Sequence, residues 1–277
     1  MKKYQQILHK IFRFYNGEKR SCLLKIIYSD DVFIIGYPKS GNSWVRFLIG
    51  NYLTGNDCDF TNTHLIVPGI VEYPDECNRL KRPRFMHAHW TWDKFMEHFS
   101  VTKKMNNKIL FIVRDGRDVA VSYFYHLKKF GQIDIQTKFE DYLDTFNGGN
   151  YFPYQKWGRY INAWIDENLH NENFLILRYE DLKTRTESEL ERVLRFAGLM
   201  IDSANIHSAI HASDFNRMQQ LEELQRNDHS RLKESDNRIR FIRQGKTNQW
   251  KFLFNRKQLE QFNEVHGKAL RKLGYPS

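Results

Sequence analysis

The sequence of 277 residues predicts a single α/β domain, in which helices cover both faces of a central parallel sheet. Three mainly apolar runs, at 32–35, 108–114 and 173–179, carry this prediction. Each is short, rich in β-branched or aromatic residues, and followed by turn residues and a helical pattern, as expected of strands buried on both faces. Because no linker rich in Pro, Gly or Ser divides the chain, we expect one domain over 1–277.

The composition is that of an ordinary globular protein, with 41% hydrophobic and 27% charged residues. Lys and Arg total 43 against 33 Asp and Glu, which favours an anionic ligand, an acidic acceptor or a polyanion, although a solvated basic surface explains the excess as well. The three cysteines, Cys22, Cys58 and Cys77, have no paired spacing. They therefore indicate neither a disulfide framework nor a zinc site, and we expect a reducing, cytoplasmic location.

The first 30 residues are expected to form a helical extension of the domain. They contain no secretory signal, because polar residues interrupt the apolar ones, and the sequence has no run long enough to span a bilayer. Residues 4–15 fit a short amphipathic helix. Packing of this helix against the domain is favoured over peripheral contact with a membrane surface.

A phosphate-binding loop is predicted between the first strand and the helix that follows it. The helix is indicated from Ser43 onward, where Trp44, Leu48 and Tyr52 recur every four residues. Backbone N–H groups in a glycine-containing turn, together with those of a helix N-terminus, form a concave cluster of donors that fits phosphate or sulfate oxygens. The turn at 36–41 is therefore expected to bind such a group.

This loop differs from the common ATP- or GTP-binding loop in the place of its lysine. Gly36 and Gly41 have the usual spacing, and Ser43 stands where a Mg²⁺-binding hydroxyl would lie. The residue after the second glycine is Asn42, however, and Lys39 lies inside the loop instead. A cation there can meet the bridging oxygen of a group in transfer without a metal ion. An ordinary strand, turn and helix with an incidental lysine is the alternative interpretation.

A second strand end offers a candidate base. Residues 84–90 are expected to form a short strand that ends in His87 and His89, one facing the pocket and the other facing away. A neutral imidazole is suited to take a hydroxyl proton near pH 7. A metal site is the alternative, but no nearby Cys or carboxylate pattern completes one.

The loop resembles the 5′-phosphosulfate loop of sulfotransferases that use 3′-phosphoadenosine 5′-phosphosulfate (PAPS). That family's pattern, Tyr-Pro-Lys-Ser-Gly-Thr-Thr-Trp, stands here as Tyr37-Pro38-Lys39-Ser40-Gly41-Asn42-Ser43-Trp44. Asn42 and Ser43 replace the two threonines and keep a side-chain oxygen at each position. The resemblance implies that residues 39–44 bind the donor and that Trp44 stacks on its adenine.

Arg114 and Ser122 match a second block of the same family. An arginine at the end of a strand and a serine in the following helix can converge on one anion, because ligands of open α/β sheets bind at this edge. The family's block, Arg-Asn/Asp-x-Lys/Arg-Asp-x-x-x-Ser, grips the 3′-phosphate of the nucleotide, and Arg114 and Ser122 have its spacing. A surface pair of Arg and Asp is the alternative.

A third block lies near the C-terminus, where the polar and basic segment 227–251 is expected to be a loop that covers the donor. Arg243 and Gly245 match the family's Arg-Lys-Gly, which also holds the 3′-phosphate. Gln244 replaces the lysine. The lost charge implies weaker nucleotide binding, or compensation by Lys246.

Two further residues are implied to lie beside the adenine. Tyr179 matches the tyrosine of the family's Tyr-Glu-Asp-Leu, and Phe215 matches the phenylalanine of its Ser-Phe-x-x-Met. The helix after Tyr179 is predicted to begin with a capping box from Thr186 to Glu189 and to end at Gly198.

Together these blocks imply a P-loop-like, three-layer fold and an in-line transfer of the sulfuryl group from PAPS to a hydroxyl or amine. The product would be 3′-phosphoadenosine 5′-phosphate (PAP), and no metal would be required. His89 matches the family's general base, Lys39 would stabilise charge on the bridging oxygen, and Ser122 completes the implied catalytic set. His87 replaces a lysine that is common in the family.

The acceptor and the partners are less defined. The basic and aromatic-rich segments suit an anionic or sugar-like acceptor, a glycan or glycoconjugate among them, and no nucleic acid is expected. The family's dimer motif is not matched between Lys251 and Glu260, which leaves the oligomeric state open. Two other classes are considered: a nucleotide-dependent phosphotransferase, which would need a lysine in place of Asn42, and a basic nucleic-acid-binding protein, whose affinity would depend on salt and not on PAP.

Overall fold

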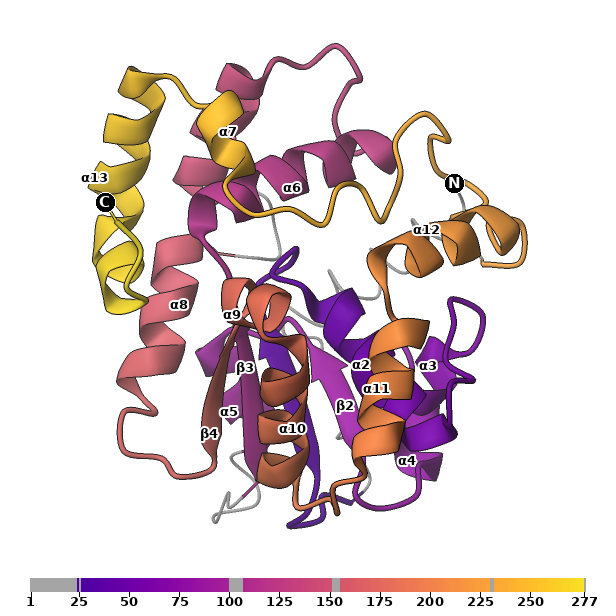
Figure 1. Ribbon diagram of the computed structural model, residues 1–277. Helices are drawn as coiled ribbons and strands as arrows, with labels where there is room; N and C mark the ends of the chain where they lie inside the picture. Colours follow the sequence, from indigo (N-terminus) through magenta and orange to yellow (C-terminus); the bar gives the residue numbers. More distant parts are fainter. Residues whose placement is uncertain (1–23, 25, 100–106, 151–154, 230–231, 277) are drawn as a thin grey trace.

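The computed structural model describes residues 24, 26–99, 107–150, 155–229 and 232–276 (Figure 1). The helix expected at 4–15, most of the extension 1–30 and Cys22 lie outside these residues. Residues 26–31 lead as coil and turn into the first strand.

Four parallel strands form the central sheet in the order β2-β1-β3-β4. They are β1 (Val32–Gly36), β2 (Phe85–Ala88), β3 (Lys108–Val113) and β4 (Phe174–Arg178). Val32 of β1 pairs with Phe85 of β2 on one side and with Lys108 of β3 on the other. The predicted parallel sheet is confirmed, and the segments that follow its strands meet at one edge.

Helices follow each strand and surround the sheet. They are α2 (Asn42–Thr54), α3 (Thr63–Ile66), α4 (Pro74–Arg79), α5 (Trp92–Phe99), α6 (Gly116–Lys129), α7 (Phe139–Gly148), α8 (Trp157–Asp166), α9 (Tyr179–Thr184), α10 (Thr186–Ala197), α11 (Ser203–Ala212), α12 (Phe215–Leu224) and α13 (Arg256–Lys272), with a 3₁₀ turn η2 (Gln249–Phe252). The turns from β1 to α2, from β3 to α6 and from β4 to α9 are short, so the helix N-termini also lie at the carboxyl edge of the sheet.

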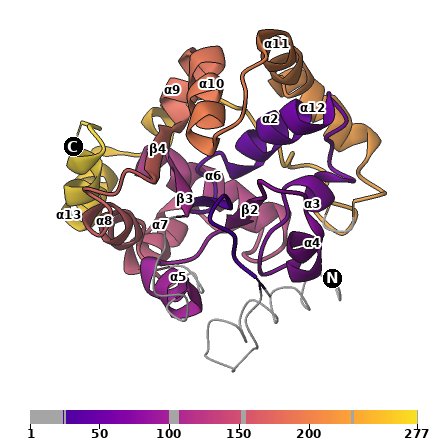
Figure 2. The same ribbon diagram turned by 90° about the horizontal axis from the view of Figure 1, so that it is seen from below.

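The two faces of the sheet build two separate cores, because neighbouring residues of a strand point in opposite directions. Val32 and Ile34 pack with α2 and α10, whereas Phe33 and Ile35 pack in a larger aromatic-rich core with α6, α8 and α13. Figure 2 shows α2, α10 and α11 on one side of the strands and α8 and α13 on the other. The residues that follow the strands are therefore held between two packed layers.

The helix after Tyr179 differs from prediction at its start. Only Arg185 separates α9 from α10, and Thr186 is already helical and donates its hydroxyl hydrogen bond back to the Leu182 carbonyl at 2.8 Å. Glu189 pairs with Arg192 instead of reaching back to the helix start. The predicted capping box is therefore wrong, although the predicted end at Gly198 is confirmed by its left-handed backbone, φ 83°.

Candidate active site

The loop between β1 and α2 has the backbone of a phosphate cradle. Lys39 and Gly41 both adopt the left-handed conformation, with φ of 72° and 111°, and α2 begins directly afterwards at Asn42. A Cβ on Gly41 would lie 2.7 Å from the ring of Tyr179. Only glycine therefore allows the loop and this ring to approach so closely.

Two buried side-chain donors at this loop differ from most buried polar groups. Within the described part of the chain, Ser40 Oγ and Arg114 Nε are buried and have no hydrogen-bond partner. Buried polar groups are nearly always paired, so a ligand that brings acceptor oxygens fits beside Arg114, which also lines a cavity at this loop. Asn42, in contrast, ties the loop to itself by donating from Nδ2 to the Tyr37 carbonyl at 3.2 Å.

Arg114 joins the loop to the C-terminal part of the chain. Its guanidinium donates to the Lys39 carbonyl at 3.3 Å and to the Lys246 carbonyl at 2.8 Å, and it lies 4.4 Å from the centre of the Tyr179 ring. The carboxylate of Asp118, in the first turn of α6, lies 3.6 Å from this guanidinium group. This one buried side chain therefore connects segments that follow β1, β3 and β4.

Asp118 anchors the segment that carries the third sequence block. Its carboxylate accepts from the backbone N–H of Asn248 at 2.8 Å and of Trp250 at 3.1 Å. Burial raises the pKa of this carboxyl group, whereas the charge of Arg114 lowers it. Sequence reasoning missed Asp118 as a site residue, although it stands inside the matched block.

Arg243 is held between an aromatic ring and an amide. Its guanidinium lies 4.3 Å from the centre of the Tyr125 ring and hydrogen-bonds to Gln249, whose Nε2 donates to the Lys246 carbonyl at 2.7 Å. Burial lowers the pKa of Arg243. Gly245 packs closely against Phe215, since a Cβ there would lie 2.5 Å from a carbon of that ring. Gln249 is thus a second residue that the sequence did not reveal.

Three aromatic side chains gather where an adenine is expected. Trp44 and Tyr179 make an edge contact at 5.8 Å between ring centres, and Trp44 Nε1 donates to the Ser213 carbonyl at 3.1 Å. The ammonium group of Lys183 lies 5.6 Å from the Trp44 ring and 5.9 Å from the Phe215 ring. The predicted Trp44, Tyr179 and Phe215 therefore lie at one end of the site.

His89 has a defined tautomer. Its Nδ1 lies 2.6 Å from the Gly36 carbonyl oxygen, which can only accept, so Nδ1 carries a proton and donates. In the neutral ring the lone pair is consequently on Nε2. A histidine held in this way can take a proton from a hydroxyl group.

His87 does not face away from the pocket, and the expectation that the two histidines point in opposite directions is wrong. Residues two apart in a strand lie on the same face. Both rings line the same cavity and contact each other at right angles, with 4.5 Å between their centres. His87 therefore lies beside the predicted base.

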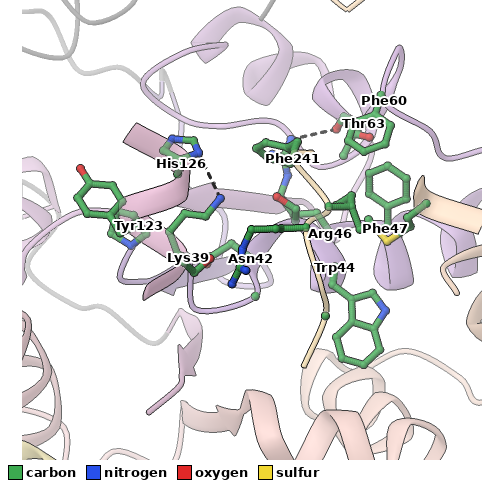
Figure 3. Close-up of a pocket in the computed structure, with 18 of the residues that line it drawn as sticks. Lys39, Asn42, Trp44, Arg46, Phe47, Phe60, Thr63, Tyr123, His126 and Phe241 are labelled. Carbon is green, nitrogen blue, oxygen red and sulfur yellow. Dashed lines mark hydrogen bonds between the residues drawn. The ribbon is translucent and has the colours of Figure 1, made fainter. Parts of the chain in front are cut away.

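Lys39 extends toward a histidine that the sequence analysis did not select. Its Nζ lies 3.3 Å from Nδ1 of His126 and 4.7 Å from the centre of the Phe241 ring. Figure 3 shows the Lys39 and His126 side chains pointing toward each other. The available signal was position alone, because His126 lies one helical turn after Ser122 on α6.

One cavity of about 1140 Å³ connects these residues. Of the predicted site residues it is lined by Lys39, Gly41, Asn42, Ser43, Trp44, His89, Arg114, Ser122, Tyr179, Phe215, Arg243, Gln244 and Gly245. Ser40 is not part of the lining, and its side chain is fully buried within the loop. Residues of all the sequence blocks therefore surround one cavity. The rest of its wall is formed by residues outside these blocks.

The family model of the sulfotransferase domain matches residues 29–274. The chain belongs to the sulfotransferase family. It is accordingly a transferase that uses PAPS as the sulfuryl donor. The match covers every block described above, from the loop after β1 to the segment before α13.

Similar proteins support the same assignment. This sulfotransferase is 26% identical to sulfotransferase 2A2 of Rattus norvegicus over 265 residues, which cover 93% of this chain and 90% of the relative. It is 26% identical to sulfotransferase 1B1 of Mus musculus over 252 residues, covering 87% and 82%.

Solved structures agree on the fold. Retinol dehydratase in complex with androsterone and PAP superposes with a TM-score of 0.72 at 18% identity, covering 99% of this chain and 88% of that one. A mouse sulfotransferase complexed with PAP gives 0.70 at 20% identity, covering 95% and 88%. The predicted P-loop-like α/β architecture is thereby confirmed.

Two other properties of the described residues bear on the sequence analysis. Within the ranges that the structure covers, no group of three His, Cys, Asp or Glu side chains is placed to hold a metal ion. Across those same ranges, no helix combines the length and apolar character that a membrane crossing requires.

Proposed function

We propose that this sulfotransferase transfers the sulfuryl group of PAPS to a hydroxyl of its acceptor, with His89 as general base and Lys39 as the cation near the bridging oxygen. The supporting observation is that the His89 ring, fixed through Nδ1 by the Gly36 carbonyl, and the Lys39 ammonium group line one cavity. When bound, PAPS supplies a sulfuryl group attached to a phosphate leaving group. The new bond forms between the acceptor oxygen and sulfur while the sulfur–phosphate oxygen bond breaks.

The donor half of the cavity is formed by the loop 39–44 and by Arg114, Ser122, Tyr179, Phe215 and Arg243, and the rest of the wall is the acceptor half. The residues of the donor half would hold PAPS by its two phosphate ends and its base. The cradle at Lys39–Ser43 suits the 5′-phosphosulfate, because its backbone donors and the α2 N-terminus favour anions. Arg114, Ser122 and Arg243 suit the 3′-phosphate, since one buried guanidinium group, one partly buried guanidinium group and a hydroxyl line that side of the cavity. Gln244 adds no charge there, and the orientation of Arg243 by Gln249 offsets part of this loss.

His89 would take the proton of the acceptor hydroxyl on Nε2. Its Nδ1–H keeps the hydrogen bond to the Gly36 carbonyl throughout, which also stabilises the imidazolium that forms. Lys39 would place its positive charge where negative charge develops on the oxygen that leaves sulfur. The chain thus supplies both a base and a fixed cation for an in-line displacement.

The acceptor is proposed to be a saccharide or another polyhydroxylated compound. Beyond the donor half, the cavity wall combines aromatic rings with polar side chains, including Phe60, His64, Glu72, Tyr73, Gln132 and Asn150. Glu72 is half-buried, and a Cβ on Gly69 would lie only 2.3 Å from its Oε2, so this carboxylate is packed against the backbone beside His87. Hydroxyl groups that donate to carboxylate and amide oxygens, with a ring to stack on, suit such a wall better than an apolar steroid.

A cytoplasmic location is proposed on the state of the cysteines. Cys58 and Cys77 are buried free thiols, and burial raises the pKa of Cys58 to about 11 and that of Cys77 to about 12. Both thiols therefore stay protonated near neutral pH and behave as packing residues, which suits a reducing compartment.

The donor proposal is tested by thermal unfolding with PAP, with ADP, and with ATP plus Mg²⁺. A ligand that binds only the folded state stabilises it by about 2.7 kcal/mol at a hundredfold excess over its dissociation constant, which raises Tm by roughly 5 °C in a protein of this size. We expect such a rise with PAP and little with ADP, because ADP lacks the 3′-phosphate. Stabilisation by ATP with Mg²⁺ and none by PAP would reject the proposal in favour of phosphoryl transfer.

The acceptor proposal needs a separate assay. Label transfer from [³⁵S]PAPS is measured with three acceptors of matched concentration: a neutral oligosaccharide such as chitotriose, a small phenol such as 2-naphthol, and a steroid alcohol. Preferential labelling of the oligosaccharide is expected. Labelling of the phenol or steroid alone would reject the acceptor class while leaving sulfuryl transfer intact.

A further inference from the structure

The contact between Lys39 and His126 joins the donor loop to the opposite wall of the cavity. Lys39 lies in the loop after β1, and His126 lies in α6, 87 residues further along the chain. The distance of 3.3 Å between Nζ and Nδ1 is within hydrogen-bond range. Lys39 also has a left-handed backbone, φ 72°, so its side chain leaves the loop in a direction fixed by a strained conformation.

This contact determines the protonation of His126. A lysine ammonium group has donors only, so Nδ1 of His126 must accept and the proton of the neutral ring must be on Nε2. A protonated ring would carry N–H groups at both positions and would repel the ammonium group. The hydrogen bond therefore exists only while His126 is neutral.

Aromatic side chains hold the His126 ring in place. Tyr123 stacks on it with 6.0 Å between the ring centres and 15° between the ring planes. The ring centres of Phe130 and Phe241 lie 4.6 Å and 6.2 Å from the centre of the imidazole. Phe241 also lies under the ammonium group of Lys39. The imidazole is thus a fixed acceptor, and Lys39 is held between it and an aromatic face.

We propose that His126 is a positioning residue for Lys39, and that its neutral imidazole keeps the ammonium group directed at the oxygen that leaves sulfur. The proposal rests on the proposed role of Lys39. It makes sulfuryl transfer depend on a second histidine besides His89. Activity is then lost as pH falls, because protonation of His126 removes the acceptor and adds a like charge next to Lys39.

The side chains around His126 determine how readily its ring is protonated. Lys39 contacts it from the loop after β1, Phe241 from the segment before η2, and Tyr123 and Phe130 from α6 itself. His89, His229, Glu234 and Arg243 are further titratable or charged side chains that line the same cavity. The positive charge of Lys39, which contacts the ring directly, disfavours protonation of His126.

The geometry is tested without turnover by NMR of the full-length protein labelled with ¹⁵N-histidine. At pH 7.5 we expect an unprotonated Nδ1 and a protonated Nε2 for the resonance that disappears in His126→Asn. Lys39→Met should shift that resonance. A protonated Nδ1, or signals unchanged by Lys39→Met, would overturn the proposal.

The role in transfer is tested by the release of [³⁵S]sulfate from [³⁵S]PAPS to water, with the thermal shift by PAP measured on the same proteins. His126→Phe keeps the ring packing but has no acceptor, and we expect kcat to fall on the order of tenfold to hundredfold with KM for PAPS nearly unchanged. His126→Asn has a side-chain oxygen near the place of Nδ1 and should recover most of kcat. Because this side chain is not protonated in the same pH range, kcat should fall less steeply than in the wild type as the pH is lowered. His170→Asn, at an exposed turn, is the matched control.

The outcomes separate this proposal from the proposed function. If the wild type neither turns over PAPS nor is stabilised by PAP, the proposed function fails. If the wild type behaves as expected and His126→Phe equals it in kcat and pH profile, the proposal for His126 alone is overturned.

Discussion

The two halves of the cavity are held together in different ways. In the donor half, charged side chains are fixed by one another and by backbone carbonyls, as Arg114 is by Asp118 and the Lys39 and Lys246 carbonyls. In the acceptor half, histidines contact other rings and reactive groups, as His87 does with His89 and His126 with Lys39. The donor half is therefore organised around fixed positive charge, whereas the acceptor half contains imidazole rings, the side chains whose ordinary pKa lies nearest to neutral pH.

Because of this difference, binding and kinetic measurements should report on different halves of the cavity. Changes in the donor half should appear in the binding of PAP, because the phosphate that its guanidinium groups are proposed to contact is present in both the substrate and the product. Changes in the acceptor half should appear in kcat and its pH dependence, because proton transfer occurs only during reaction. A variant that affects both equally would contradict the division.

The largest effect is expected from His89→Asn. The asparagine amide can keep the hydrogen bond to the Gly36 carbonyl but has no base in the place of Nε2, so kcat should fall by roughly 10²- to 10⁴-fold. The thermal shift by PAP should stay at the wild-type value. A kcat within about threefold of wild type would mean that another group takes the proton.

The next largest effect is expected from Arg243→Gln, which removes a charge from the donor half. Hydrogen bonds to charged groups contribute about 1.5–3 kcal/mol, so PAP should bind on the order of 10- to 100-fold more weakly, with ADP nearly unchanged. Isothermal titration with both nucleotides measures this selectivity. Arg240→Gln, at an exposed position of the same segment, serves as the control, and equal losses for PAP and ADP would argue against contact with the 3′-phosphate.

A pH effect on stability must be separated from the pH effects on activity, and His266 of α13 is expected to supply one. It accepts from the Gly158 N–H at 3.1 Å, and burial lowers its pKa to about 3 from an ordinary value of 6.5. Between about pH 6.5 and 3 the unfolded chain therefore binds a proton at this side chain that the folded chain does not bind. Within this window the free energy of unfolding decreases by about 1.4 kcal/mol for each unit by which the pH is lowered. Urea unfolding between pH 7 and 5 measures it.

His266→Asn provides the comparison for this slope. The variant should be less stable at pH 7, because the core loses packed volume, yet its stability should depend less steeply on pH. Equal slopes in the two proteins would show that folding does not lower the pKa of His266. Activity assays are then interpretable only above the pH at which the wild type begins to unfold.

The smallest effect is expected from Glu72→Gln in the acceptor half. Loss of the carboxylate charge should raise KM for an oligosaccharide acceptor by about threefold to tenfold, since one hydrogen bond contributes about 0.5–1.5 kcal/mol. PAP binding should not change. Asp75→Asn, at an exposed position of α4, is the control. If Glu72→Gln raised KM for PAPS more than KM for the acceptor, Glu72 would belong to the donor half.

Much of the donor half could be predicted from the sequence, because its residues follow strands that are readable as apolar runs. Arg114 and Ser122 stand at a spacing that places both at the carboxyl edge once the strand and helix are known. Lys39 and Gly41 stand out in the same way, since a turn between a buried strand and a helix needs unusual backbone conformations.

The acceptor half could not be predicted in this way. The pairing of Lys39 with His126 depends on how α6 lies across the sheet, and the position of Gln249 against Arg243 depends on a segment without a regular pattern. The direction of His87 was predictable in principle, since alternation along a strand places it with His89. The side chains that meet across the cavity are set by tertiary packing, which local periodicity does not contain.

The hydrogen bonds of Arg114 also have a consequence for the order of folding. This side chain connects carbonyl groups of residues 39 and 246, so the phosphate cradle is secured only after nearly the whole chain is available. A nascent chain that has emerged through α12 would contain the complete sheet and yet lack the last contact of the donor loop. Affinity for PAP should therefore arise late in synthesis, after the sheet itself has formed.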